Sequence, residues 1–182
     1  NVPYEERGEI MDENLRIMKN IWSEKNPSFS GKYFHFKDVH FSPKVVQKPH
    51  PPIWIGGESP RAIRRAAELG NGWFPIDCNP TFPLMTVDQM KMGIASLRAQ
   101  IRKAGRKPEE VKVGYIAQNF ELKDRRDDRR LFAGDSLKII EAIQEFEKLG
   151  ISFLAINFLR ENTEATKKYS ERFATDVMRR VS

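Results

Sequence analysis

The chain opens with apolar residues at intervals of three and four, which is the spacing of one face of a helix. These residues are Met11, Leu15, Met18 and Trp22. The pattern predicts a helix from Tyr4 to Ser23 with a single apolar stripe. Residues 32 to 41 then alternate aromatic with polar side chains, and this alternation predicts a short surface hairpin.

From Pro52 onward, a short apolar run followed by an amphipathic stretch occurs four times. The predicted strands cover residues 53–55, 73–75, 111–117 and 151–158. The predicted helices lie between Ser59 and Gly70, between Thr86 and Gly105, between Asp135 and Gly150, and from Thr163 to Val181. Capping residues support two of these helix starts, because Ser59 precedes a proline and Thr86 with Gln89 matches a capping box.

Strands that alternate with helices predict an α/β fold with a parallel sheet and right-handed crossovers. Two architectures fit this pattern, a doubly wound open sheet and a (β/α)8 TIM barrel. A complete barrel needs eight strand–helix units and about 250 residues. The four units of this chain, preceded by a helix and a hairpin, correspond to half of such a barrel.

Length and composition indicate a single domain that spans residues 1–182. The chain is 40% hydrophobic and 31% charged, as in water-soluble domains, and no apolar run approaches the roughly 20 residues of a membrane helix. The polar opening residues do not form a secretory signal. The single cysteine, Cys78, excludes an intrachain disulfide. We therefore expect a cytoplasmic protein that does not bind membranes.

The net charge of +6 raises the question of nucleic-acid binding. The basic residues are interspersed with acidic ones, most clearly in segment 123–130, and do not form a uniform basic run. We interpret segment 123–130 as a solvated loop and expect no nucleic-acid partner.

In parallel α/β folds, ligands bind at the carboxyl ends of the strands, and the most informative end is Gly56-Gly57-Glu58-Ser59. Two glycines before a helix N-terminus let an anion approach backbone N–H groups, and the helix dipole favours a phosphate there. Ser59 adds a hydroxyl, whereas the charge of Arg61 opposes the dipole unless an anion or solvent offsets it. The same residues also fit a plain tight turn with a capping serine and a solvated arginine. A Rossmann nucleotide site is disfavoured because G-x-G-x-x-G is absent.

Other residue types with catalytic potential form no pattern. Three histidines lack the spacing of a metal site and are expected at the surface; they are His35, His40 and His50. Cys78 has no histidine nearby in the sequence and is expected to be an inert thiol, and Trp54 and Trp73 are expected in the core. Because no Ser-His-Asp set or carboxylate pair can be recognised, no catalytic residue is assigned and no metal is expected.

Several segments resemble, in order, the luciferase-like monooxygenase family. They are Asn1–Gly8, Gly31–Phe34, Pro43–Pro49, Pro51–Gly57 and Gly70–Trp73. Gly134-Asp135-Ser136 and Leu149-Gly150-Ile151 are similar to its last units more loosely. Each segment alone is weak, but the ordered series covers nearly the whole chain and is specific.

The resemblance implies a (β/α)8 barrel with oxidoreductase or monooxygenase activity on a small-molecule substrate, and usually a dimer. Members of the family use reduced flavin or coenzyme F420, a deazaflavin, and the stretch after the fifth strand helps to hold the cofactor near its phosphate. By this resemblance Gly56, Gly57, Glu58 and Ser59 contact the cofactor. The Gly-Gly turn and the segment Gly-Asn-Gly-Trp are similar to the F420-dependent branch, with FMN as the alternative, although Asn71 stands where that branch often has aspartate.

In the family, a segment such as Asn1–Gly8 follows the first four strands. The resemblance therefore implies that this chain corresponds to the C-terminal half of the barrel, which we expect to be inactive alone. One rival interpretation is a non-catalytic half-barrel that self-associates through its unpaired sheet edges and open apolar interior. The other is an open-sheet phosphate-binding domain.

Overall fold

The main sheet consists of parallel strands that follow each other in chain order. The computed structural model describes residues 3–127 and 129–181, so Asn1, Val2, Asp128 and Ser182 lie outside it. Within the described residues, the sheet contains β3 (Trp54–Gly56), β4 (Gly72–Phe74), β5 (Lys112–Ala117) and β8 (Ile151–Ile156). All three neighbouring pairs are parallel, which confirms the predicted sheet with borders shifted by one or two residues.

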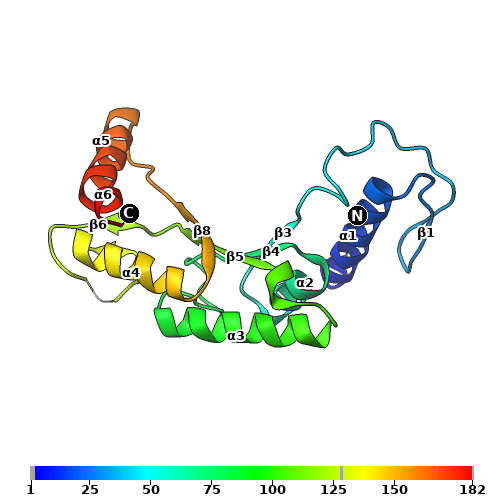
Figure 1. The fold of residues 1–182 in the computed structure, drawn as a ribbon, viewed down its shortest axis with the longest axis horizontal. Helices are drawn as coiled ribbons and strands as arrows, with labels where there is room; N and C mark the ends of the chain where they lie inside the picture. The colour runs from blue at the N-terminus through cyan, green and yellow to red at the C-terminus, as the bar shows by residue number, and fades with distance from the viewer. Residues whose placement is uncertain (1–2, 128, 182) are drawn as a thin grey trace.

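A helix follows each of these strands. They are α2 (Pro60–Leu69), α3 (Val87–Lys103), α4 (Ser136–Lys148) and α5 (Thr163–Phe173). Figure 1 shows α2, α3 and α4 in an arc along the outer side of the curved sheet. A sequential strand order with helices on the outer side is barrel topology, whereas a doubly wound sheet reverses its strand order at a switch point. The doubly wound alternative is therefore wrong.

The N-terminal part contains α1 (Arg7–Ser23) and a hairpin of β1 (Phe29–Ser30) and β2 (His35–Phe36). The hairpin begins earlier than the predicted segment 32–41. Its turn lies where the first strand was expected, because the backbone N–H of Gly31 donates to the carbonyl oxygen of Phe34 at 2.9 Å. Alternation of aromatic residues located the hairpin but not its turn.

The predicted apolar stripe on α1 is wrong in detail. Met11 is 50% exposed and Met18 is 39% exposed, whereas Asp12 and Glu13 are buried. Two arginines of α2 pair with Asp12, and two backbone N–H groups of the hairpin donate to Glu13. Buried carboxylates are tolerated where such partners compensate them, and these partners lie too far along the chain for periodicity to reveal them.

The core lies between the sheet and the outer helices. Trp73 is fully buried, as predicted, together with Tyr115 and with residues from the inward faces of three helices. The latter include Ala66, Met90 and Ile139. The Tyr115 ring stands edge-on to Phe146 of α4, with ring centroids 4.8 Å apart. This packing fixes the helices against one face of the sheet. These helices do not cover the other face.

That other, inner face carries a row of aromatic rings, of which the central one, Phe74, is half-buried and the two outer ones are exposed. Trp54, Phe74 and Phe153 come from β3, β4 and β8, and the ring centroid of Phe74 lies 5.6 Å from that of Trp54 and 5.7 Å from that of Phe153. Trp54 is 37% exposed and Phe153 is 57% exposed. The expectation that Trp54 is a core residue is therefore wrong, because strand alternation turns its ring to the inner face.

Glycines make room for these rings. Trp54 lies over Gly72 and Phe74 lies over Gly114, and a Cβ at either glycine would come within 3 Å of the ring above it, at 2.3 Å and 2.5 Å respectively. The row of rings is thus seated in the backbone of the neighbouring strands.

Most of segment 123–130 is the exposed loop that was predicted, with Asp124, Arg125, Arg126 and Arg129 exposed and Asp128 outside the described residues. Asp127 is buried and accepts hydrogen bonds from Lys123 at 2.8 Å and from Arg129 at 2.8 Å and 3.0 Å. The segment is flanked by β6 (Glu121–Leu122) and β7 (Ala133–Gly134), which pair in parallel. Charges of the segment are therefore compensated partly within it and partly by residues outside it, such as Glu141, which pairs with Arg126, and Arg172, which pairs with Asp124.

The predicted helix from Thr163 to Val181 is interrupted. A π-helical turn, Ala174–Met178, separates α5 from α6 (Arg179–Val181), and Val177 in this turn is fully buried. A 3-10 turn, Pro108–Glu110, precedes β5. In the part of the chain that the structure describes, no helix has the length and apolar character needed to cross a membrane.

Candidate functional site

The turn from β3 to α2 depends on the backbone conformation of Gly57 and on a hydrogen bond from a core residue. Gly57 has a positive φ of 98°. A residue with a side chain would be destabilising in this conformation. Its carbonyl oxygen accepts a hydrogen bond from the indole N–H of Trp73 at 2.8 Å. Ser59 caps α2, because its hydroxyl oxygen accepts from the backbone N–H of Ala62 at 3.2 Å, as its sequence position predicted.

Glu58 joins the end of β3 to the segment after β4. Its buried carboxylate accepts from the backbone N–H of Ile76 at 2.9 Å and from the side-chain amide of Asn79 at 2.7 Å. The side-chain carbonyl oxygen of Asn79 accepts in turn from two backbone N–H groups, those of Thr81 and Phe82. Both oxygens of Glu58 are therefore engaged by the protein, and the side chain holds the turn in place.

Asp77 repeats this arrangement one strand further along. Its buried carboxylate accepts from the backbone N–H groups of Gln118 and Asn119, at 3.1 Å and 3.2 Å, just beyond the end of β5. Burial raises the pKa of Asp77, and the backbone hydrogen bonds from Asn119 and Gln118 oppose that rise. The two carboxylates thus connect three consecutive strand ends.

The connection continues to β8. The side-chain amide of Asn157 donates to the backbone carbonyl oxygen of Gln118 at 3.3 Å. The backbone N–H of Asn157 donates to the backbone carbonyl oxygen of Ala117 at 3.1 Å. We call the carboxyl ends of β3, β4, β5 and β8, with the residues that follow them, the mouth of the sheet.

The first turn of α2 retains unpaired donors at this mouth. Among the described residues, no group accepts from the backbone N–H of Glu58, Ser59 or Arg61. Such groups at a helix N-terminus form an environment that favours an anion. The backbone of the turn is therefore held by a hydrogen bond from the core, while the N–H groups of Glu58, Ser59 and Arg61 have no acceptor among the described residues.

Arg61 points toward α1 rather than toward this anion-favouring environment. It lines a cleft of 430 Å³ together with three carboxylates, those of Glu5, Glu9 and Asp12. Its positive charge contributes to lowering the pKa of Glu9, after the larger effects of Lys32 and Tyr33. Acidic residues of α1 therefore offset the arginine charge that the sequence placed against the helix dipole.

Among the remaining candidates from the sequence, Cys78 lies next to Asn79, whose side-chain amide donates to Glu58 of the turn. His35 and His40 are exposed, His50 is half-buried and Cys78 is exposed with a free thiol. The Asn71 side chain accepts from the backbone N–H of Ile53 at 3.0 Å, at the amino end of β3, so it closes the base of the sheet. Within the described residues, no group of three potential ligand side chains lies close enough to hold a metal ion.

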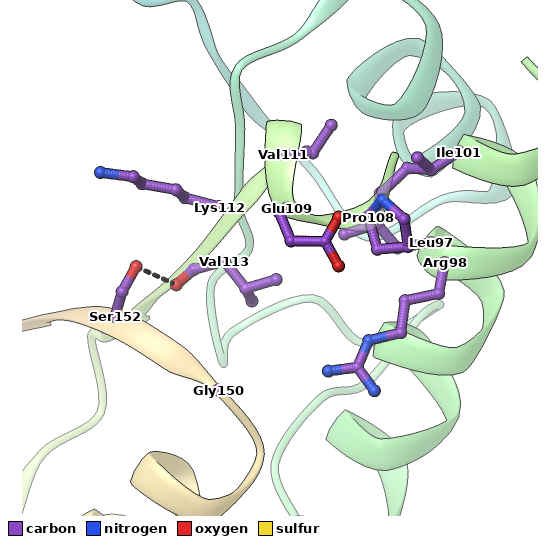
Figure 2. A pocket seen from close by; sticks show the side chains of 10 residues that line it. All are labelled: Leu97, Arg98, Ile101, Pro108, Glu109, Val111, Lys112, Val113, Gly150 and Ser152. Atoms are coloured by element: carbon purple, nitrogen blue, oxygen red, sulfur yellow. Dashed lines mark hydrogen bonds between the residues drawn. The ribbon is translucent and has the colours of Figure 1, made fainter. Parts of the chain in front are cut away.

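Two pockets lie at opposite ends of β5 and β8. The pocket in Figure 2 has a volume of 260 Å³ and lies at the amino ends, where Ser152 donates to the Val113 carbonyl oxygen at 3.3 Å. The other pocket, of 610 Å³, lies at the mouth and is lined by residues that include Gln118, Asn157 and Arg160. Because barrel active sites form at the carboxyl ends, the second pocket belongs to the functional face.

Sequence reasoning missed the partners of Glu58 and Asp77 and the position of Arg160. An acidic residue within three residues of the end of each of two consecutive strands was the available signal. Its meaning depends on which strands are neighbours, and that becomes visible only in the folded sheet.

Comparison with known proteins decides the family. A sequence profile described as luciferase-like monooxygenase matches residues 1–130. The chain belongs to the luciferase-like monooxygenase family. An FMNH(2)-dependent dimethylsulfone monooxygenase from Pseudomonas putida is 34% identical over 114 residues, which are 63% of this chain and 29% of that relative. The corresponding protein of Pseudomonas fluorescens is 30% identical over 114 residues, 63% of this chain and 28% of its own length. This chain thus matches less than a third of these luciferase-like relatives.

Solved structures confirm the barrel fold. The monooxygenase RslO1 from Streptomyces bottropensis superposes with a TM-score of 0.74 at 18% identity, over 100% of this chain and 64% of that one. The coenzyme F420-dependent tetrahydromethanopterin reductase from Methanopyrus kandleri gives a TM-score of 0.66 at 13% identity, over 96% of this chain and 62% of that one. This luciferase-like chain therefore has the fold of part of a (β/α)8 barrel, as the resemblance implied.

We predict that Glu58→Gln destabilises the protein. The amide –NH₂ of glutamine would face either the Ile76 N–H or the Asn79 amide, and one buried donor would lose its acceptor. The free energy of unfolding should fall by about 1–3 kcal/mol, measured by urea denaturation.

Glu68→Gln is the matched control, because this substitution makes the same change of charge at an exposed position of α2. Its free energy of unfolding should stay within about 0.5 kcal/mol of the parent. Equal losses in the two variants would mean that Glu58 does not hold the mouth.

Proposed function

We propose that this chain provides the phosphate-anchoring wall of a luciferase-like oxidoreductase that works with a reduced flavin or deazaflavin coenzyme on a small-molecule substrate. The observation that carries the proposal is the turn Gly56–Ser59, whose backbone is locked from inside while its N–H groups at the mouth stay unpaired. The family and its barrel fold support a cofactor at this end of the strands.

The turn suits a phosphate for steric and electrostatic reasons. Gly56 is exposed and Gly57 has no side chain, so the backbone can be approached closely. The N-terminus of α2 carries partial positive charge, and the unpaired N–H groups of Ser59 and Arg61 can donate to phosphate oxygens. These groups are already fixed in position, so binding a phosphate orders little additional backbone.

The four residues carried over from the resemblance then divide into two roles. Gly56, Gly57 and Ser59 form the contact surface for the phosphate. Glu58 acts as a positioning residue, because the protein already engages both its carboxylate oxygens. The coenzyme, when bound, supplies the hydride or electron transfer chemistry; this wall binds and orients it.

Two coenzymes remain candidates. The Gly-Asn-Gly-Trp segment at residues 70–73 favours coenzyme F420 by resemblance. The names of the two sequence relatives, both FMNH(2)-dependent, favour FMN. Because both coenzymes carry a phosphate, the same turn serves either, and direct binding distinguishes them.

We predict weak or absent binding of FMN and F420 by this chain, and clear binding by a chain to which the first four strand–helix units of a relative are added. The added units complete the pocket around the ring system, whereas this chain supplies one wall. Isothermal titration of both chains with both coenzymes measures the difference and identifies the preferred coenzyme. Tight binding by this chain alone would contradict the assignment of a single wall.

In the extended chain, Gly57→Val should weaken coenzyme binding about tenfold or more, because its side chain occupies the approach to the turn. Gly105→Val is the matched control, since Gly105 also has a positive φ, of 69°, with nothing within 4 Å of its Cβ position. Equal affinities in both variants would remove the turn from the site.

A second candidate, a self-associating partial barrel, is favoured by the exposed aromatic row on the inner face. In the described residues, β3 and β8 end the sheet with one side of each unpaired, and Phe153 is 57% exposed beside Trp54. Two copies related by a twofold axis would provide eight parallel strands, the number with which such barrels close. We propose that the occupant of this face in solution is a second copy of the chain.

Light scattering tests the second candidate. The chain should show twice the monomer mass, and Phe153→Asp should return it to the monomer by placing a charge in the apolar interface. Met92→Asp, at an exposed position on α3, should leave the mass unchanged. A folded chain that stays monomeric at high concentration would exclude this arrangement.

A further inference from the structure

Arg160 lies at the mouth, in the connection from β8 to α5. Figure 1 shows the course of this connection. Its guanidinium lies over the ring of Tyr169, 3.5 Å from the ring centroid. It donates to the carbonyl oxygen of Leu159 at 2.6 Å and to that of Phe120 at 3.4 Å. Stacking and hydrogen bonds together hold the planar group in one orientation.

The backbone around Arg160 is held equally well. The Arg160 N–H donates to the hydroxyl of Thr166 at 3.0 Å, and the Leu159 N–H donates to the side chain of Asn157 at 3.0 Å. Asn162 caps α5 directly behind this segment. The arginine is therefore placed before any ligand arrives, which lowers the cost of binding.

No carboxylate among the described residues pairs with Arg160. The acidic residue that lines the same pocket, Glu121, is already neutralised by Lys123 at 2.8 Å and by Arg130 at 3.1 Å. Lys123 also forms an ion pair with Asp127. The guanidinium thus contributes an uncompensated positive charge to the pocket, and part of its five N–H donors remains unused.

Gln118 completes the arrangement from the neighbouring strand end. Its exposed side-chain amide lines the same pocket of 610 Å³, and no hydrogen bond within the described residues occupies that amide group. A fixed guanidinium and a free amide that line the same pocket suit an oxyanion, which can accept N–H bonds from both.

We propose that the pocket between the ends of β5 and β8 binds the oxyanion group of a small-molecule ligand through Arg160 and Gln118. The ligand class is an organic acid that carries a carboxylate, a sulfonate or a phosphate. This site lies on the same mouth as the Gly56–Ser59 turn but on different strands, so it is a second anchor and does not depend on the coenzyme proposal.

Titration of this chain with acetate, methanesulfonate and inorganic phosphate, followed by ¹⁵N-resolved NMR, tests the proposal. Saturable shifts are expected at the Arg160 side-chain Nε–H and at the Gln118 side-chain amide. The anion with the tightest binding identifies the oxyanion group. Shifts confined to the backbone of Ser59 and Arg61 would overturn this site while supporting the phosphate site on the turn, and absence of saturable shifts would also overturn it.

Arg160→Gln should weaken the binding about tenfold or more. Arg102→Gln, which makes the same charge change at an exposed position at the end of α3, should bind as the parent does. Equal weakening in both variants would show attraction to net charge only and overturn the site, and so would parent-like binding by folded Arg160→Gln.

Arg160→Lys decides the matter if Arg160→Gln does not fold. Lysine keeps the charge but loses the planar fork and its stacking on Tyr169. A several-fold loss of affinity with a native-like spectrum would support the proposal, and unchanged affinity would overturn it.

Discussion

The mouth of this sheet depends on carboxylates that are buried at the ends of the strands. Glu58 reaches from the end of β3 to the backbone after β4, and Asp77 reaches from the end of β4 to the backbone after β5. Each carboxylate provides acceptors for N–H groups beyond the strand ends that have no other partner among the described residues. The raised pKa of Asp77 shows that burial has a cost, which the converging hydrogen bonds partly offset. Strand ends that usually diverge into mobile loops are thereby held in register.

The buried acids hold the mouth in place, whereas other groups at the mouth are available to contact a ligand. The acids face inward and bind the neighbouring strand, so the outward surface of the mouth is formed by backbone N–H groups at one side and by Arg160 with Gln118 at the other. Both sides carry N–H donors that suit an anion, and hydrogen bonds hold the turn and the Arg160 guanidinium in place. The inner face below the mouth has the opposite character, since Trp54, Phe74 and Phe153 form an apolar row whose outer rings, Trp54 and Phe153, are exposed. A polar rim above an apolar interior is the arrangement that a flavin-type coenzyme, with its phosphate and its flat ring system, requires.

The sequence predicted the features that depend on short-range spacing. The caps at Ser59 and Thr86 were correct, because each bonds to an N–H three residues away. The strand–helix alternation predicted the α/β class with a parallel sheet but fitted both a doubly wound sheet and a barrel, and the family resemblance decided for the barrel. Features that depend on distant partners were not predictable: Asp12 is buried because arginines of α2 reach it, and Trp54 is exposed because of the side of the sheet that it faces. Glu58 was assigned to the site from the resemblance, but its hydrogen bonds to the segment after β4 required the strand order.

Native-state hydrogen exchange at the amides of Gln118 and Asn119 tests the role of the buried carboxylates most directly. These amides lie beyond the end of β5 and donate to Asp77. If Asp77 holds the mouth, they should exchange as slowly as amides inside β5, and about tenfold or more slowly than the amide of exposed Asp124. Exchange as fast as that of Asp124 would contradict a mouth held together by buried carboxylates.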